Sequence, residues 1–201
     1  GPDAPVFEDM DYVGDLGNQR TQVLLHLGRD EEATAQLLAS SRVSEFGADN
    51  VSQVLNLALL HTRRGQTAEA REALSRLGDQ LSPFGRLIER YVRLRIALGE
   101  GDQATADAAL AYLATNEAIN PTVYLEGLVD AGRLDEAAAL LIRQLAGETT
   151  RADALLNLQT LRRPPVLAGE VEQAARWEAL RARGDVRAAA LRVGYLESHP
   201  L

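Results

Sequence analysis

The chain has 201 residues, a formal net charge of −8 and no cysteine, and 46% of its residues are hydrophobic. These values exclude a mostly disordered chain, disulfides, thiolate nucleophiles and cysteine-ligated metals, and the acidic surplus argues against non-specific binding to nucleic acid or anionic membranes. No run of 18 apolar residues occurs, so no membrane-spanning helix is expected.

The first stretch, residues 1–14, is predicted to be an irregular tail because it contains two prolines and an acidic run. Its opening pair, Gly1-Pro2, resembles the residues that a protease leaves at a cloning junction, which suggests a fragment of a longer protein. A helical repeat domain is predicted over 15–197, and 198–201 are expected to form a short C-terminal tail.

Helical periodicity dominates from residue 15 onward. Ala and Leu, both strong helix formers, prevail among the apolar residues, and the β-branched runs typical of strands are missing. Ser82 followed by Pro83 indicates a helix start, with serine as the N-cap and proline at the first helical position. The predicted helices span 16–27, 30–40, 50–64, 67–78, 84–99, 103–115, 121–131, 134–146, 150–161, 168–183 and 186–197.

One pattern recurs five times along the chain: a glycine is followed by alanine five positions later and by an apolar residue nine positions later. Glycine tolerates the positive φ that ends the first helix of a hairpin, and alanine allows the second helix to approach the first closely. The glycines are Gly28, Gly65, Gly101, Gly132 and Gly184, the alanines Ala33, Ala70, Ala106, Ala137 and Ala189, and the apolar residues Leu37, Leu74, Leu110, Leu141 and Val193.

In these residues the chain resembles the tetratricopeptide repeat (TPR) family. The glycines match the family's inter-helix turn, the alanines its small position in the second helix, and the apolar residues a position that is usually aromatic. The first three glycine spacings, 37, 36 and 31 residues, bracket the family period of about 34. The family's first-helix Trp and Tyr positions are largely unfilled, so the array is degenerate. The resemblance implies an all-α fold, a right-handed α-α superhelix of about five helical hairpins, with an open curved trough lined by the first helices.

The last glycine spacing, 52 residues, is too long for one repeat and contains the additional predicted helix 150–161. Two arrangements are open at this point. This helix can pair with 168–183 and leave 186–197 as a cap, or it can be an unpaired insertion. Trp177 and Tyr195 are expected to lie in the core, because terminal hairpins need large side chains to close the stack.

Catalytic and metal-binding patterns are not found. The histidines, His26, His61 and His199, lack the spacing of metal ligands, and no nucleophile motif or glycine-rich phosphate loop occurs. We therefore expect no enzyme, no catalytic or metal-binding residue and no cofactor.

An arginine face is the most unusual local feature of this acidic chain. Arg86, Arg90 and Arg93 share one side of the helix predicted at 84–99. They can form an anion site for an acidic peptide, or a solvated face in which Glu89 and Arg93 pair across one helical turn.

A second group of candidate binding residues follows from the resemblance, which places certain positions of the first helices on the concave side. Packing against a neighbouring hairpin is the competing explanation for the apolar members. The positions are Asn18, Gln22, Leu55, Leu59, Thr62, Arg63, Thr122 and Glu126.

The resemblance implies a protein–protein interaction module that binds a peptide or protein on its concave face. Two alternatives are a regulatory or sensory domain of a larger multidomain bacterial protein, and a self-association domain that forms a homodimer through its terminal hairpins. The negative charge can attract a basic partner or can serve solubility alone. We expect a soluble protein, in the cytoplasm rather than the periplasm, although the sequence fixes no compartment.

Overall fold

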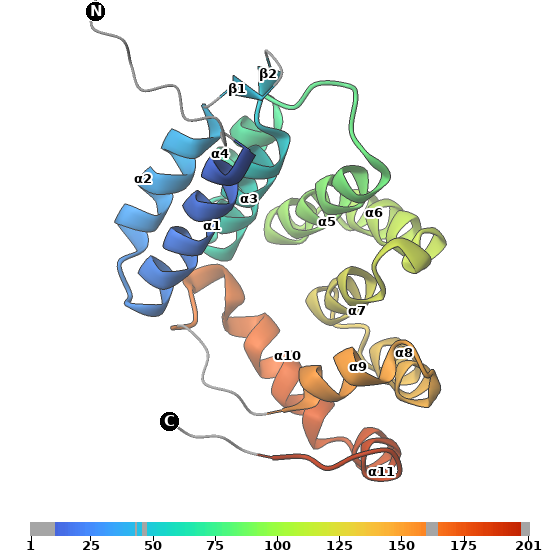
Figure 1. Ribbon diagram of the computed structural model, residues 1–201. Coiled ribbons are helices and arrows are strands. Elements are labelled where there is room, and N and C mark those ends of the chain that lie inside the picture. The colour runs from blue at the N-terminus through green and yellow to red at the C-terminus, as the bar shows by residue number, and fades with distance from the viewer. Residues whose placement is uncertain (1–10, 43, 46–47, 160–164, 198–201) are drawn as a thin grey trace, which may run out of the picture.

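The computed structural model describes residues 11–42, 44–45, 48–159 and 165–197, and over these residues the fold is all-α (Figure 1). Two 3₁₀ helices, η1 (Glu117–Ile119) and η2 (Ala168–Glu170), and a short antiparallel ribbon of β1 (Ser44–Glu45) and β2 (Ala48–Asp49) accompany the α-helices. The α-helices are α1 (Asp11–His26), α2 (Asp30–Ser41), α3 (Val51–Arg63), α4 (Thr67–Leu74), α5 (Pro83–Glu100), α6 (Gln103–Thr115), α7 (Pro121–Asp130), α8 (Leu134–Ala146), α9 (Arg151–Leu158), α10 (Val171–Ala182) and α11 (Gly184–Leu191).

The predicted helices all occur among the described residues, and those at 103–115 and 134–146 have the predicted bounds. The boundary at residue 14 is wrong, because α1 already begins at Asp11. The rest of that predicted tail, and 198–201, lie outside the described residues. The β1–β2 ribbon was not predicted, since two-residue strands are too short to show an alternating pattern.

Helical hairpins form the first four repeats: α1 packs on α2, α3 on α4, α5 on α6 and α7 on α8. Each pair is joined through a predicted turn glycine, and these four glycines have φ values of 68°, 74°, 74° and 71°. This left-handed backbone conformation is strained for any residue with a Cβ, which explains why glycine recurs at the turn. The glycines are Gly28, Gly65, Gly101 and Gly132.

Gly184 does not fit the predicted pattern. It opens α11 and has no positive φ. Arg183 is the single residue between α10 and α11. Its φ of −60° and ψ of 132° are extended, so this connection needs no left-handed residue. The helix predicted at 186–197 also ends early, at Leu191. Beyond that end, Gly194 packs so closely on Leu155 that a Cβ would lie 2.8 Å from its Cδ1.

The small positions of the repeats explain how the helices come close to one another. The five predicted alanines are all buried. Gly127 also lets α7 pack closely on its neighbours, because a Cβ at this position would lie 2.9 Å from Leu113 Cδ1 and 3.1 Å from Leu94 Cδ2. The predicted N-cap is confirmed, since the Ser82 hydroxyl accepts a hydrogen bond from the Gly85 amide at 3.0 Å.

The hairpins follow one another along an arc, with α1, α3, α5 and α7 on its inner side, and α10 runs across the open side of the arc (Figure 1). At one end of α10, η2 lies against α3, and along its length α10 packs on α7, α8 and α11. The expected open trough is therefore bounded by a later helix, α10, in the described chain. Helix α9 packs on α8, and so does α11.

Two apolar cores fill the arc. The N-terminal core joins α1 to α5, and the C-terminal core joins α5 to α11. Helix α5 contributes to both, with Val92 and Ile96 on one side and Leu87 and Leu94 on the other. Leu167 belongs to the N-terminal core although it follows nine helices in the chain, so the C-terminal segment ties the two ends of the arc together.

Candidate functional site

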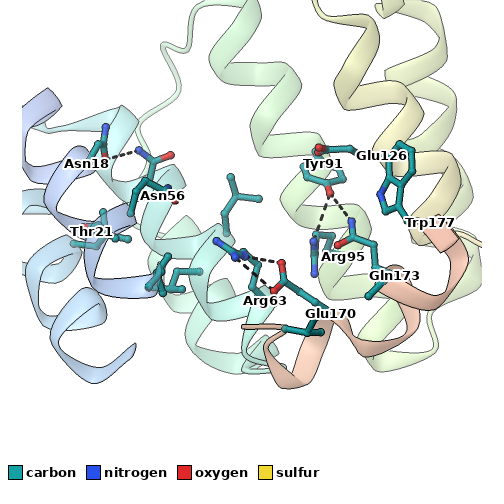
Figure 2. Close-up of a pocket in the computed structure, with 17 residues that line it drawn as sticks. Asn18, Thr21, Asn56, Arg63, Tyr91, Arg95, Glu126, Glu170, Gln173 and Trp177 are labelled. Atoms are coloured by element: carbon teal, nitrogen blue, oxygen red, sulfur yellow. Dashed lines mark hydrogen bonds and ion pairs between the residues drawn. The ribbon is translucent and has the colours of Figure 1, made fainter. Parts of the chain in front are cut away.

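A cavity of about 560 Å³ lies on the inner side of the arc, and we call it the central cavity. Side chains from α1, α2, α3, α5, α7 and the segment 166–177 line it. This volume is in the range of sites that hold a small ligand or a few residues of a peptide. Figure 2 shows the wall from α1 and α3 facing the wall from α5 and α10, with polar groups on both.

The α1–α3 wall presents a pair of amides. Asn56 Nδ2 donates a hydrogen bond to Asn18 Oδ1 at 2.9 Å (Figure 2). Within the described residues, no hydrogen bond is seen to Asn18 Nδ2 or Asn56 Oδ1. The pair therefore leaves an amide NH₂ group and a carbonyl oxygen for a ligand, the two kinds of group that pair with the C=O and N–H of a peptide.

The opposite wall contains a buried polar cluster, formed by Tyr91, Arg95 and Asp130. The Tyr91 hydroxyl donates to Asp130 Oδ2 at 2.8 Å, and Arg95 Nη1 lies 3.8 Å from the same oxygen. Gln173 Nε2 of α10 donates to the Tyr91 hydroxyl at 3.5 Å, and Arg176 donates to the Asp130 backbone carbonyl. This cluster thus joins α5, α7 and α10 through side chains that water reaches poorly.

Burial controls the protonation of this cluster. It raises the pKa of Asp130, although the Arg95 charge and the Tyr91 hydrogen bond act in the opposite direction. Burial also raises the pKa of Tyr91 well above its usual value, and the neighbouring Asp130 charge adds to that increase. The phenol therefore stays protonated at neutral pH and remains a hydrogen-bond donor to the carboxylate.

The segment 165–170, which we call the strap, forms one end of the cavity. Glu170 Oε1 accepts a hydrogen bond from Arg63 Nε at 2.7 Å, across 107 positions of sequence. Arg95 Nη2 donates to the Gly169 carbonyl at 3.2 Å, and the Leu167 side chain is 8% exposed in the N-terminal core. The strap is thus held by the ends of α3 and α5.

The predicted concave-face residues divide into two groups. Leu55 is buried in the N-terminal core, and the Thr122 amide donates to the N-cap side chain of Asn120 at the start of α7. Thr62 is buried, with its hydroxyl donating to the Leu59 carbonyl. The residues that do line the central cavity are Asn18, Gln22, Leu59, Arg63 and Glu126.

The arginine face lies elsewhere. Glu89, 3% exposed, makes ion pairs with all three arginines, including the predicted pair with Arg93 one turn away. The Arg90 guanidinium lies over the Tyr112 ring of α6, with 5.4 Å to its centroid, and Arg93 lines a smaller hollow with α4 and α6 residues. None of Arg86, Arg90 and Arg93 is among the described residues that line the central cavity, and the Glu89–Arg93 pair of the solvated-face alternative is present.

Several cavity residues could not be read from the sequence. Tyr91 and Arg95 are one helical turn apart, which hints at a shared face, but nothing indicates that Glu170 and Gln173 return to meet them. Trp177 is buried, as predicted, and also lines the cavity. Tyr195 is 71% exposed, so its predicted place in the core is wrong, because the chain leaves α11 before reaching it.

Comparisons with protein-family models, curated proteins and solved structures find no match to the chain. Among the described residues, no group of three or more His, Asp or Glu side chains is arranged to hold a metal ion. No described helix combines the length and the apolar character needed to cross a bilayer.

Proposed function

We propose that the chain is a peptide-binding module built on a TPR-like superhelix, and that a partner peptide binds in the central cavity. The observation that carries this proposal is the convergence of four first helices, α1, α3, α5 and α7, on one cavity of about 560 Å³. Concave surfaces of stacked hairpins suit extended or helical ligands, because neighbouring repeats present side chains to the same ligand.

The chemistry of the cavity walls supports a peptide. The Asn18 and Asn56 amides match the donor and acceptor of a peptide group. Leu59 of α3 offers apolar surface on the same wall as these amides and Trp177 on the opposite wall, which suits an aliphatic or aromatic side chain of the partner. Polar groups among apolar walls are the usual composition of a specific binding site.

The test uses peptides selected on the purified chain from a random display library. For the double variant Asn18→Ala plus Asn56→Ala, we expect affinity to fall by at least about tenfold, which corresponds to about 1.4 kcal/mol and to the loss of hydrogen bonds made inside the cavity. Arg93→Ala serves as the control, because this residue lies on the α4–α6 side and leaves the cavity unchanged. Equal affinities for the chain and the double variant would contradict the proposal.

Self-association is a second candidate, and one specific observation favours it. Leu16 and Val23 lie on one side of α1, the first helix of the arc, Leu27 directly follows its last residue, and all three are more than half exposed. An apolar helix face of this kind suits pairing with a second copy through terminal hairpins. Light scattering at two concentrations, on the chain and on Val23→Glu, tests this: a concentration-dependent mass in the chain alone supports a dimer.

A further inference from the structure

The strap is bound to the inner face of the arc as a separate peptide would be. It is distant in sequence from the helices that hold it. Leu167 lies in the N-terminal core, the Gly169 carbonyl accepts a hydrogen bond from Arg95 of α5, and Glu170 pairs with Arg63 at the end of α3. The residues that flank these three anchors, Val166 and Val171, are more than half exposed. A short set of anchors between exposed residues is the arrangement expected of a bound linear motif.

Gly169 is the most selective of these anchors. A Cβ at this position would lie 2.2 Å from the Thr62 carbonyl oxygen, 2.7 Å from the Gly65 amide nitrogen and 3.0 Å from the Arg63 carbonyl oxygen. All three are backbone atoms at the α3–α4 turn, and they cannot rotate away as the end of a side chain can. The surface at this turn therefore accepts a glycine and rejects any larger residue.

Glu170 supplies the charge complement. Its carboxylate and the Arg63 guanidinium have side chains that are 17% and 23% exposed, so water screens this pair only in part. Glu170 Oε2 also accepts a hydrogen bond from the Leu167 amide at 3.2 Å, which closes the turn of the strap. An acidic residue directly after the glycine thus satisfies the arginine and fixes the shape of the segment.

We propose that the strap occupies a binding site for a partner segment of the same chemistry, and that partner and strap compete for it. The motif is an apolar residue, then glycine two positions later, then an acidic residue directly after the glycine. This inference rests on the proposed function, because the site is one end of the central cavity. Only chains in which the strap is released can bind the partner. The apparent affinity is therefore the intrinsic affinity multiplied by the fraction of such chains.

The probe is a fluorescein-labelled peptide with the sequence of residues 165–171, and its binding to the full chain is followed by fluorescence anisotropy. The chain variant Gly169→Ala removes the strap from the site, and we expect it to bind this peptide at least about tenfold more tightly than the unmodified chain. Gly184→Ala is the matched control, since a Cβ at position 184 meets no atom within 4 Å, and it should bind like the unmodified chain. A peptide with alanine in place of the glycine should not bind.

A second variant protects the test against misfolding. Glu170→Gln keeps the glycine but removes the charge of the strap, so it should also bind the peptide more tightly than the unmodified chain, with an unchanged helical CD signal. If neither variant binds more tightly, the strap is a permanent part of the fold and the inference is wrong. A dimer of Gly169→Ala in light scattering would assign the site to a second copy and would also overturn the proposal of a separate partner.

The two proposals fail in different ways. If library peptides bind in the central cavity but the strap peptide binds none of the variants, only the competition is refuted. If no library peptide depends on Asn18 and Asn56 while the strap peptide does bind Gly169→Ala, the site at the α3–α4 turn stands without the cavity. If neither class of peptide binds, both proposals are refuted.

Discussion

At the scale of single residues, the most consequential group is Tyr91 with Asp130. A buried carboxylate is unfavourable unless partners surround it, and here the Tyr91 hydroxyl donates to it and the Arg95 guanidinium pairs with it, while Arg176 donates to the Asp130 backbone carbonyl. The cluster connects three helices that are distant in the chain. Its integrity therefore decides how firmly α10 stays across the arc.

Tyr91→Phe tests this cluster. The substitution keeps the ring but leaves the Asp130 carboxylate without its 2.8 Å donor, so we expect the free energy of unfolding to fall by about 1–3 kcal/mol. Urea denaturation followed by CD gives the measurement. Tyr195→Phe is the control, because its side chain is 71% exposed and its loss of a hydroxyl should leave the midpoint unchanged. Equal midpoints for both variants would show that the hydrogen bond adds nothing.

The pH dependence of stability provides an independent test of Asp130. Because burial raises its pKa in the folded chain, the folded state holds this proton more tightly than the unfolded state does. The stability from this group is complete below the unfolded pKa of about 3.9 and is lost as the pH rises through the folded pKa. Asp130→Asn cannot titrate at this position, so its stability does not change with pH through this group. As the pH falls through the folded pKa of Asp130, the unmodified chain should therefore gain stability relative to the variant.

Asp185 should show the opposite slope. Its hydrogen bond with Arg183 lowers the pKa of Asp185 to about 2, so its stabilising effect is present above about 3.9 and is lost as the pH falls towards 2. In Asp185→Asn that effect is missing at every pH. Denaturation curves from pH 2 to 7 for both variants therefore separate the two carboxyl groups, and parallel curves would contradict both assignments.

At the scale of elements, the chain shows how far a local pattern determines a helical hairpin. Helix ends, turn glycines and buried alanines depend on a few neighbouring residues, so most of them could be predicted from the sequence. The position of the strap could not, because it depends on an ion pair between Arg63 and Glu170 that no local pattern announces. Periodicity likewise grouped Arg86, Arg90 and Arg93 on one helix face, but it could not say which neighbouring helix that face meets.

Two glycines with the same sequence pattern are predicted to respond differently to alanine. Gly101 has φ 74° and Gly184 has no positive φ, and a Cβ at either position meets no atom within 4 Å. The two positions therefore differ in backbone conformation and not in space. Gly101→Ala should lower the free energy of unfolding by about 1–2 kcal/mol through left-handed strain, whereas Gly184→Ala should be neutral or stabilising by up to about 1 kcal/mol. Thermal denaturation of both variants measures these changes. Equal losses of stability in Gly101→Ala and Gly184→Ala would contradict the prediction.

At the scale of the whole molecule, the strap changes the behaviour expected of a repeat array. In a simple stack each hairpin contacts only its neighbours, and stability is close to a sum of local terms. Here Leu167 inserts into the N-terminal core while Trp177 and Leu180 of the adjoining helix are buried in the C-terminal core. The two ends of the arc are therefore coupled directly and not only through α5.

Leu167→Ala tests this coupling by hydrogen exchange. Removal of a buried leucine side chain lowers the free energy of unfolding by about 2–5 kcal/mol where the surrounding residues cannot fill the space. In the variant, the strap should open before the hairpins do. We expect faster amide exchange in α3 and in its turn to α4, where the strap is held, with little change in α6 and α8. Leu156→Ala is the control, because this leucine is more than half exposed on α9. Faster exchange spread evenly over all helices would show instead that the arc unfolds as one cooperative unit, in which the strap is no more separable than any other segment.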